Sequence, residues 1–172
     1  MGIFKPDMYK KTIFDISYSK LKEQGIRCLV FDLDNTLGLI SHKSCPIETK
    51  KLLKKLKKDF IVVICSNNTK RRLKPYLDDL EIDGVAWSMK PSIKGLFSIK
   101  LKYHLKRKEM CIIGDQIVTD ILAGNRFRVH TVLVDPLGKK DLKITGLNRK
   151  IEAIIVRHYE KKGIFKKGKY YE

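Results

Sequence analysis

Four short segments of the sequence carry side chains suited to phosphoryl transfer. They are Asp32-Leu33-Asp34-Asn35-Thr36, Ser66-Asn67-Asn68, Lys90-Pro91, and Gly114-Asp115 followed by Asp120. A carboxylate can attack phosphorus or move a proton, and several carboxylates together can hold a divalent cation. Hydroxyl, amide and ammonium groups can stabilise the negative charge of a phosphoryl group. The combination predicts a phosphoryl-transfer site, provided that the fold brings the four segments together.

Each segment follows a short apolar run that is typical of a buried strand. Strands are expected at residues 28–31, 61–65, 84–87, 110–113 and 129–134, and helices at 47–58, 69–80, 92–105 and 116–124. This alternation predicts an α/β fold with a doubly wound, mainly parallel sheet flanked by helices, since each parallel connection requires a crossover. Ligands of such sheets bind at the carboxyl ends of the strands, where all four segments would lie.

The segments that flank this alternation are amphipathic. One helix is expected at about residues 8–24 and another at about 147–161, and the lysine-rich end, 161–172, is expected to be a mobile tail. A length of 172 residues suits a single domain, 1–172, whose core spans about residues 26–135. Cys28, Cys45, Cys65 and Cys111 lack the spacing of a metal site and are expected to be reduced core thiols.

In order, residue type and position after the strands, the four segments resemble the signature motifs of the haloacid-dehalogenase superfamily over roughly residues 28–124. The resemblance implies that Asp32 is a nucleophile that forms an acyl phosphate and that Asp34 is the general acid and base. It further implies an Mg²⁺ cofactor, whose ligands would be Asp32, the backbone carbonyl of Asp34, Asp115 and Asp120. The implied phosphate-binding residues are Thr36, Ser66, Asn67 and Lys90.

Each segment taken alone has a simpler interpretation. Asp34-Asn35 is typical of a turn, Ser66-Asn67-Asn68 of a helix cap, and Asp115 of a helix start. Lys90 is one of many lysines in a basic chain, and most such lysines are only solvated. The hypothesis of a catalytic site therefore rests on the four segments occurring together, each at the end of a predicted strand.

The spacing of the segments leaves no room for the cap domain that closes over small substrates in many haloacid-dehalogenase phosphatases. Residues 37–46 alone separate Thr36 from the next expected helix, and residues 69–89 hold only one helix and one strand. The site is therefore expected to be open. An open site suits a phosphate carried by a lipid, a protein or a nucleic-acid end, because the rest of such a substrate need not be enclosed.

The chain is strongly basic, with 37 Lys and Arg against 19 Asp and Glu and a formal net charge of +18. This balance favours anionic partners, either membranes of acidic phospholipid or nucleic acid, although a lysine-rich surface without a partner would give the same composition. No apolar stretch has the length of a membrane span or the pattern of a signal peptide, so we expect a cytoplasmic protein that meets a membrane only peripherally. The sequence predicts no particular oligomeric state.

At a finer level the chain resembles the YqeG subgroup of capless phosphatases of subfamily IIIA, which is related to phosphatidylglycerophosphatases. The resemblance rests on Gly25-Ile26, Cys65-Ser66-Asn67-Asn68, Gly114-Asp115-Gln116 with Thr119-Asp120, Ala123-Gly124-Asn125-Arg126, and Thr145, Asn148-Arg149 and Glu152. Residues 38–43 lack the aromatic residue expected there, and the lysine-rich end is unusual. The resemblance implies that phosphatidylglycerophosphate is dephosphorylated to phosphatidylglycerol.

Two other functions stay open on the sequence alone. A soluble phosphatase of nucleotides or sugar phosphates would use the same residues and would act on small esters without vesicles. A non-catalytic protein that binds RNA or the ribosome would use the basic surface, and its affinity would fall steeply with salt. The sequence carries no recognisable RNA-binding motif, which counts against this second alternative.

Overall fold

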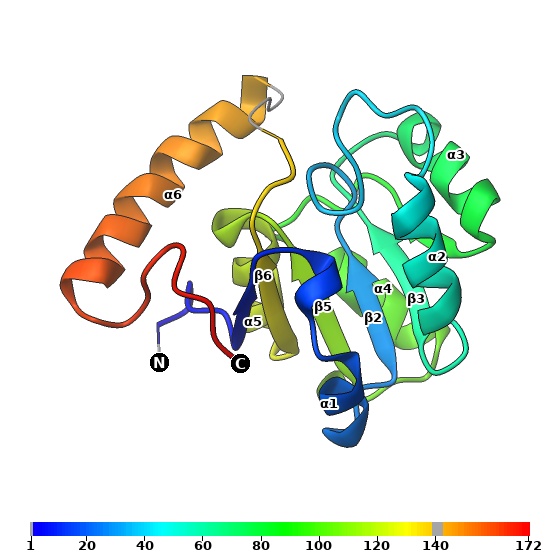
Figure 1. Ribbon diagram of the computed structural model, residues 1–172, viewed down its shortest axis with the longest axis horizontal. Helices are drawn as coiled ribbons and strands as arrows, with labels where there is room; N and C mark the ends of the chain where they lie inside the picture. Colours follow the sequence, from blue (N-terminus) through cyan, green and yellow to red (C-terminus); the bar gives the residue numbers. More distant parts are fainter. Residues whose placement is uncertain (1, 139–142) are drawn as a thin grey trace.

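A six-stranded sheet forms the centre of the computed structural model, which describes residues 2–138 and 143–172 and their side chains except those of 143–149 (Figure 1). Its strands are β1 (Met8–Lys10), β2 (Cys28–Phe31), β3 (Ile61–Cys65), β4 (Asp83–Val85), β5 (Met110–Gly114) and β6 (His130–Val134). They lie in the order β1-β6-β5-β2-β3-β4, and every neighbouring pair is parallel. The carboxyl ends of β2 and β5 are therefore adjacent near the middle of the sheet.

Helices cover both faces of the sheet. The α-helices are α1 (Tyr18–Glu23), α2 (Ile47–Leu56), α3 (Lys70–Leu80), α4 (Lys94–Lys102), α5 (Leu122–Phe127) and α6 (Lys143–Lys161). Short turns of 3-10 helix form η1 (Ile13–Asp15) and η2 (Arg107–Glu109), and a π-helical turn forms η3 (Ile117–Ile121). Buried side chains of α1, α2 and α3 pack on one face and those of α4 and α5 on the other, while α6 lies beside the β1 and β6 end (Figure 1).

The predicted apolar runs are continuous because both faces of the central strands are buried. In β2, Leu29 and Phe31 face one apolar cluster while Cys28 and Val30 face the other, and all four side chains are inaccessible to solvent. The cysteines are free and buried, and burial raises the pKa of each thiol. The expectation of reduced thiols in the core is therefore confirmed.

The predicted doubly wound parallel sheet is confirmed, and β2 and β3 begin and end at the predicted residues. In the described part of the chain no domain is inserted between β2 and α2, where residues 32–46 form a loop, so the fold is capless as expected. Helix α6 begins earlier than predicted, and the side chains of Thr145, Asn148 and Arg149 lie outside the described residues. No helix among the described residues combines the length and the apolar character needed to cross a membrane.

The N-terminal segment is not the single amphipathic helix predicted at residues 8–24. Its first residues form β1, in which Met8 and Tyr9 are buried and pair with Val132 and Leu133 of β6. A 3-10 turn, η1, follows, and α1 begins only after it. The prediction was wrong because pairing with a strand that is distant in the sequence decides the conformation of residues 8–10, and spacing within the segment carries no sign of that pairing.

The C-terminal segment is packed and not mobile. Phe165 is only 4% exposed and lies against Tyr9, and Tyr171 forms an antiparallel bridge with Tyr9 through two backbone hydrogen bonds of 3.0 and 2.9 Å. The Tyr171 hydroxyl also donates to the Pro6 carbonyl oxygen at 2.9 Å. The expectation of a mobile tail at 161–172 was wrong because its aromatic residues extend the buried cluster at β1, while the lysines between them stay at the surface.

Candidate active site

Three carboxylates meet at the carboxyl ends of β2 and β5. Asp32 follows β2 directly, Asp115 follows β5 directly, and Asp120 lies in η3. Their exposed fractions are 9%, 1% and 1%, and one oxygen from each carboxylate lies within 4.8 Å of the others. The pairing of Phe31 with Ile113 in the sheet places the first two carboxylates side by side, as the strand-end argument predicts.

Asp120 reaches this carboxylate cluster because the chain turns tightly after β5. The backbone N–H of Gln116 donates to Asp120 Oδ2 at 3.2 Å, and the π-helical turn brings the side chain back over Gly114. A Cβ atom at Gly114 would lie 2.3 Å from the Asp120 carboxylate, so only glycine leaves space for that group. From α6, the Glu152 carboxylate accepts the Ile117 N–H at 3.3 Å and holds the start of the turn.

Lys90 joins the carboxylate cluster from the loop after β4. Its Nζ lies 2.6 Å from Asp32 Oδ1, 2.7 Å from Asp120 Oδ1 and 2.6 Å from the Cys65 carbonyl oxygen. Asn67 fixes the loop, because its Oδ1 accepts the Lys90 N–H at 2.6 Å and its Nδ2 donates to the Lys90 carbonyl oxygen at 2.9 Å. Lys90 is only 5% exposed and is therefore an inward-facing ion-pair partner, not a solvated surface lysine.

The charge states in the cluster follow from its burial. Burial raises the pKa of the Asp32 carboxyl to about 7, although the ammonium of Lys90 opposes this rise. Burial alone would lower the pKa of Lys90, but the negative charges of Asp120 and Asp32 outweigh this effect and raise that pKa above its ordinary value. Lys90 is therefore an ammonium ion, and a divalent cation bound at the cluster would further favour the ionised form of Asp32.

The carboxylate of Asp34, in the loop after β2, is not part of the carboxylate cluster and is bonded to residues at the start of α3. Its Oδ1 accepts hydrogen bonds from Nε and Nη2 of Arg72 at 3.0 and 2.7 Å, and its Oδ2 accepts one from Asn68 Nδ2 at 2.9 Å. Three N–H donors on one carboxyl group match its ionised form. With the side chain engaged in this way, contact of Asp34 with a cation at the cluster would come from the backbone carbonyl, as the family resemblance implies.

Arg72 is a site residue that the sequence analysis did not identify. Besides Asp34, it binds the loop after β2, where it donates to the carbonyl oxygens of Leu39, at 3.1 Å, and of His42. A signal was present in the sequence, since three basic residues, Lys70 to Arg72, open α3, where the helix dipole disfavours positive charge. Such a placement indicates that at least one of these side chains has an anionic partner, but it does not indicate which one.

The predicted phosphate-binding residues gather at the same edge of the sheet but have different partners. Ser66 is 3% exposed and its Oγ accepts a backbone N–H at 3.2 Å, which leaves the hydroxyl hydrogen for another acceptor. The Thr36 hydroxyl donates to Asp115 Oδ1 at 3.3 Å, and the Asn67 amide holds the loop that carries Lys90. Ser66 and Lys90 thus lie at the edge that carries the carboxylate cluster, and the polar groups of Thr36 and Asn67 are bonded to other residues of this edge.

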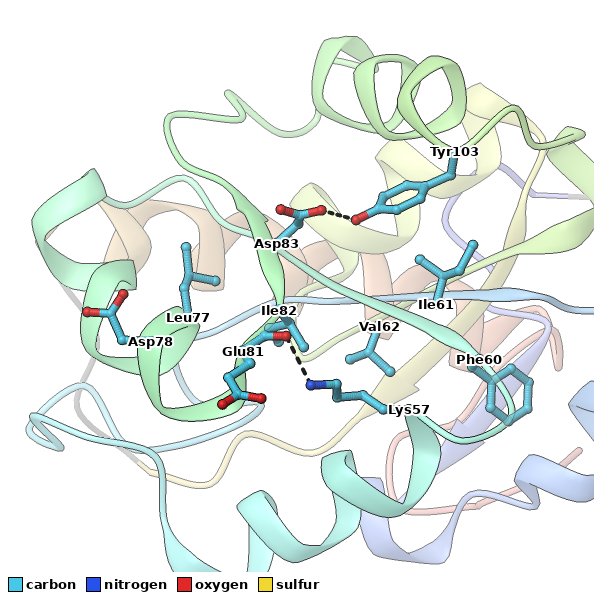
Figure 2. Close-up of a pocket in the computed structure, with 10 residues that line it drawn as sticks. All are labelled: Lys57, Phe60, Ile61, Val62, Leu77, Asp78, Glu81, Ile82, Asp83 and Tyr103. Carbon is cyan, nitrogen blue, oxygen red and sulfur yellow. Dashed lines mark hydrogen bonds between the residues drawn. The ribbon is translucent and has the colours of Figure 1, made fainter.

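A hollow of about 520 Å³ lies at the opposite edge of the sheet, at the amino ends of β3 and β4 (Figure 2). Lys57 Nζ donates to the Glu81 carbonyl oxygen at 3.0 Å on one side of it, and the Tyr103 hydroxyl donates to Asp83 on the other. None of the predicted site residues lines this hollow. It has no part in the carboxylate cluster, and the candidate site is identified by its side chains alone.

Known proteins agree with this arrangement. A family model described as haloacid dehalogenase-like hydrolase matches residues 29–93, and one described as HAD-hydrolase-like matches residues 89–150. The chain is 36% identical over 161 residues to "Probable phosphatase YqeG" of Bacillus subtilis (strain 168), and the alignment covers 93% of this chain and 94% of that protein. The chain belongs to the haloacid-dehalogenase-like hydrolases. The expected enzyme class, a phosphatase of the haloacid-dehalogenase type, is thereby confirmed at the level of the family.

Three solved structures share the fold of this hydrolase. An uncharacterized protein from Listeria monocytogenes serotype 4b gives a TM-score of 0.55 at 18% identity, over 68% of this chain and 85% of that one. A HAD family enzyme from Bacteroides thetaiotaomicron gives a TM-score of 0.52 at 15% identity, over 71% of this chain and 98% of that one. The cobalt-bound deoxy-D-mannose-octulosonate 8-phosphate phosphatase YrbI from Haemophilus influenzae gives a TM-score of 0.50 at 19% identity, over 84% of this chain and 95% of that one. At these identities the likeness concerns the fold alone.

The carboxylate cluster of this hydrolase fits a hard divalent cation. Asp32, Asp115 and Asp120 offer only oxygen ligands, which Mg²⁺ prefers, and no cysteine or histidine, which zinc sites commonly use, belongs to the described cluster. The oxygens are also close enough together for one ion to reach all three. A metal ion can therefore be held here, in agreement with the metal dependence of haloacid-dehalogenase hydrolases.

The substitution Gly114→Ala tests the placement of Asp120. The new methyl group would overlap the Asp120 carboxylate, so we expect the Mg²⁺ concentration for half-maximal phosphate release to rise about 10- to 100-fold, as when a metal ligand loses its support. Gly124→Ala is the matched control, because its Cβ would lie 2.4 Å from Thr131 and 2.5 Å from Ile112, in the core. Both variants should lose thermal stability. An equal loss of Mg²⁺ affinity in both would show that the effect is not specific to Asp120.

Proposed function

We propose that this hydrolase is an Mg²⁺-dependent phosphomonoesterase that acts through an aspartyl phosphate and converts phosphatidylglycerophosphate to phosphatidylglycerol. The observation that carries the reaction type is the 2.6 Å contact of Asp32 with Lys90 inside a cluster that also holds Asp115 and Asp120. A nucleophile, a fixed positive charge and oxygen ligands for a cation are thereby within reach of one phosphoryl group.

In the first half of the proposed reaction, a carboxylate oxygen of Asp32 attacks phosphorus and the bond between phosphorus and the ester oxygen breaks. Asp34 must carry a proton at this stage and gives it to the leaving oxygen, which leaves Asp34 as the carboxylate that Arg72 and Asn68 bind, and the phosphoryl group becomes an acyl phosphate on Asp32. Lys90 and Ser66 stabilise the negative charge that is spread over the phosphoryl oxygens. Because the ammonium of Lys90 is already held in place by the protein, no reorganisation is needed as this charge develops.

In the second half, Asp34 takes a proton from a water molecule as the water attacks phosphorus, and inorganic phosphate leaves with Asp32 restored. Arg72 and Asn68 hold Asp34 as a carboxylate, which is the form that this step requires. When bound, Mg²⁺ would supply further positive charge to the phosphoryl group. Its proposed ligands are the carboxylates of Asp32, Asp115 and Asp120 and the backbone carbonyl of Asp34.

Three properties support a lipid phosphate as the substrate. The described loop between β2 and α2 contains no cap domain, so a headgroup at a surface can approach the site. The net charge of +18 supports peripheral contact with an anionic membrane, since each basic residue near such a surface contributes roughly 1 kcal/mol. The relationship to a YqeG protein strengthens the subgroup resemblance from which the lipid substrate was inferred.

Phosphate release from vesicles tests this proposal. Vesicles that contain phosphatidylglycerophosphate are compared with a panel of soluble nucleotide and sugar phosphates, each with Mg²⁺ and with excess EDTA. We expect release from the vesicles to exceed that from every soluble ester, to vanish in EDTA and to return when Mg²⁺ is added.

Each of the other outcomes identifies a different function. Mg²⁺-dependent activity confined to soluble esters would contradict the lipid substrate and leave the reaction type standing. Activity that survives EDTA would contradict the cation's role. No activity on any ester, together with RNA binding that weakens steeply with salt, would replace the enzyme with a binding protein.

A further inference from the structure

The loop that carries Lys90 alternates between buried polar and exposed apolar side chains. Ser88 and Lys90 face inward, at 3% and 5% exposure, and both are bonded to Asn67. Trp87 and Met89 face outward, at 60% and 66% exposure. Two large apolar side chains therefore stand in solvent directly beside a residue of the candidate active site, where the alternation leaves them no buried partner.

The backbone of this loop is held in an unfavourable conformation. Trp87 and Met89 have φ values of +51° and +55°, in the left-handed region that non-glycine residues usually avoid at a cost of about 1–2 kcal/mol each. Two backbone hydrogen bonds to the loop after β3 hold this conformation. The Trp87 N–H donates to the Asn68 carbonyl oxygen at 3.0 Å, and the Ser88 N–H donates to the Ser66 carbonyl oxygen at 3.0 Å. Neither Gly nor Asn, the residues that suit this conformation, occupies these positions. A tryptophan and a methionine at exposed, strained positions indicate a function other than stability.

The surface around these two side chains is basic. No acidic residue occurs in the loop segments 36–46, 66–69 and 86–93, which follow β2, β3 and β4. Exposed cations stand beside the loops, at Lys70 and Arg71 on the first turn of α3 and at Lys94 on the first residue of α4. Exposed acidic side chains such as Asp59 and Asp83 lie at the opposite edge of the sheet, and Glu48, on the first turn of α2 at this edge, is paired with Lys51 at 3.0 Å.

We propose that Trp87 and Met89 insert into the interface of an anionic phospholipid bilayer, while Lys70, Arg71 and Lys94 contact its headgroups. Tryptophan and flexible apolar side chains suit the boundary between headgroups and acyl chains, and basic residues are attracted to acidic lipid. This docking surface faces the membrane with the same edge of the sheet that carries Lys90 and Asp32. It deepens the proposed function and rests on it only for the identity of the lipid substrate.

A second exposed apolar face competes with this one. On α6, Ile151 and Ile154 are 43% and 67% exposed, and Ile3, which lines a hollow together with Ile154, is 47% exposed. Helix α6 lies at the β1 and β6 end of the sheet (Figure 1). Trp87 and Met89 follow β4, which is the last strand at the other end of the strand order. A substitution at Ile154, which is as exposed as Met89 but lies on α6, is therefore a matched control for one at Met89.

Trp87 is the single tryptophan of the chain, so intrinsic fluorescence reports directly on the proposed surface. The test adds the wild-type protein to substrate-free vesicles of equimolar phosphatidylglycerol and phosphatidylcholine, and to phosphatidylcholine alone. We expect a shift of the emission to shorter wavelength, and quenching by brominated acyl chains, with the anionic vesicles only. Emission that stays that of a solvated tryptophan while the protein sediments with the vesicles would overturn the proposal.

Variants extend the test beyond the tryptophan itself. Met89→Asn removes an apolar side chain and introduces a residue that tolerates the left-handed conformation, so the loop should keep its shape. We expect the vesicle partition coefficient to fall about tenfold in Met89→Asn and to be unchanged in Ile154→Asn. The reverse pattern would assign docking to α6 and overturn the proposal. Emission that responds to RNA and not to vesicles would overturn it as well, in favour of nucleic acid.

The docking surface and the proposed substrate fail in different ways. Insertion of Trp87 into substrate-free vesicles without hydrolysis of phosphatidylglycerophosphate would support the docking surface and contradict the substrate. Hydrolysis of that lipid while Trp87 stays in water would support the substrate and contradict the docking surface.

Discussion

Asp32→Asn is expected to lower Mg²⁺-dependent phosphate release by roughly 10⁴-fold or more, because an amide oxygen cannot form the acyl phosphate. The wild-type protein, quenched during turnover and treated with borohydride, should yield homoserine at position 32, since this reagent reduces an acyl phosphate to the alcohol. The variant should yield none. Residual activity within tenfold of the wild type would contradict the assignment of Asp32 as nucleophile.

The loss of activity in Asp32→Asn should not come from unfolding. The asparagine side chain has the same shape and can still accept the hydrogen bond from Lys90 Nζ, which is 2.6 Å long in the wild type. Asp120, at 2.7 Å, remains to pair with the ammonium. We therefore expect a melting temperature, measured without metal, within a few degrees of the wild-type value.

A matched control for Asp32→Asn is Asp135→Asn, a substitution at the same edge of the sheet. Asp135 follows β6, but its carboxylate accepts hydrogen bonds from the hydroxyls of Tyr9, at 2.5 Å, and Tyr170, at 2.6 Å, and has no contact with the cluster. Its replacement should reduce phosphate release no more than about twofold, in line with a role in packing. A loss of phosphate release in this variant equal to that in Asp32→Asn would mean that the activity depends on any carboxylate at this edge, and the assignment of Asp32 as nucleophile would lose its support.

The sequence predicted those parts of the fold in which burial alone decides the conformation. Strands β2 and β3 lie between two layers of helices, so their runs are apolar on both faces and their ends are marked by the first polar residues, Asp32 and Ser66. Strand β1 is different, because it is three residues long and owes its conformation to β6. Local patterns carry no information about such a partner, and the same holds for the bridge between Tyr171 and Tyr9.

Within the candidate site, the sequence predicted which residues gather but not how they divide their contacts. Asp32, Asp115 and Lys90 each follow a strand, so they were predicted to lie at the carboxyl ends of the parallel strands, and the structure brings them together there. The position of a residue after a strand carries no information on side-chain direction, so the bonds of the Asn67 amide to the Lys90 backbone could not be predicted. Arg72 escaped prediction for the same reason, since its partner depends on how α3 packs against the loop after β2.

Lys90→Met is expected to destabilise the protein by about 3–5 kcal/mol in the absence of metal, the usual cost of leaving a buried charge without its partner. The ammonium is buried and contacts Asp32 at 2.6 Å and Asp120 at 2.7 Å, and methionine fills the space without supplying a charge. Phosphate release should fall about 10²- to 10³-fold, as when a donor to the transition state is lost. Chemical denaturation in EDTA gives the free energy of unfolding.

The matched control for Lys90→Met is Lys102→Met, which breaks another lysine–aspartate pair. Lys102 Nζ lies 2.6 Å from Asp83, but the two side chains are 58% and 47% exposed. Solvent already screens this pair, so its loss should cost no more than about 1 kcal/mol. A similar free-energy loss in the two lysine variants would contradict the view that Lys90 compensates buried charge.

The pH dependence of Lys90→Met distinguishes lost charge compensation from lost packing. Burial already raises the pKa of Asp32 from 3.8 to about 7 in the wild type, against the opposing charge of Lys90, and removal of that charge raises it further. The folded variant then keeps a proton that the unfolded chain has released, so the stability of the variant falls as pH rises above 3.8. Its deficit relative to the wild type should be smaller at about pH 5 than at about pH 8.

The double variant Asp32→Asn/Lys90→Met gives a second test of charge compensation. Its loss of unfolding free energy should be smaller than the sum of the losses in the two single variants, because one of the two carboxylates that need the ammonium is gone. A deficit that is independent of pH and additive in the double variant would mean that Lys90 acts through its methylene chain, and the electrostatic account of the cluster would be wrong.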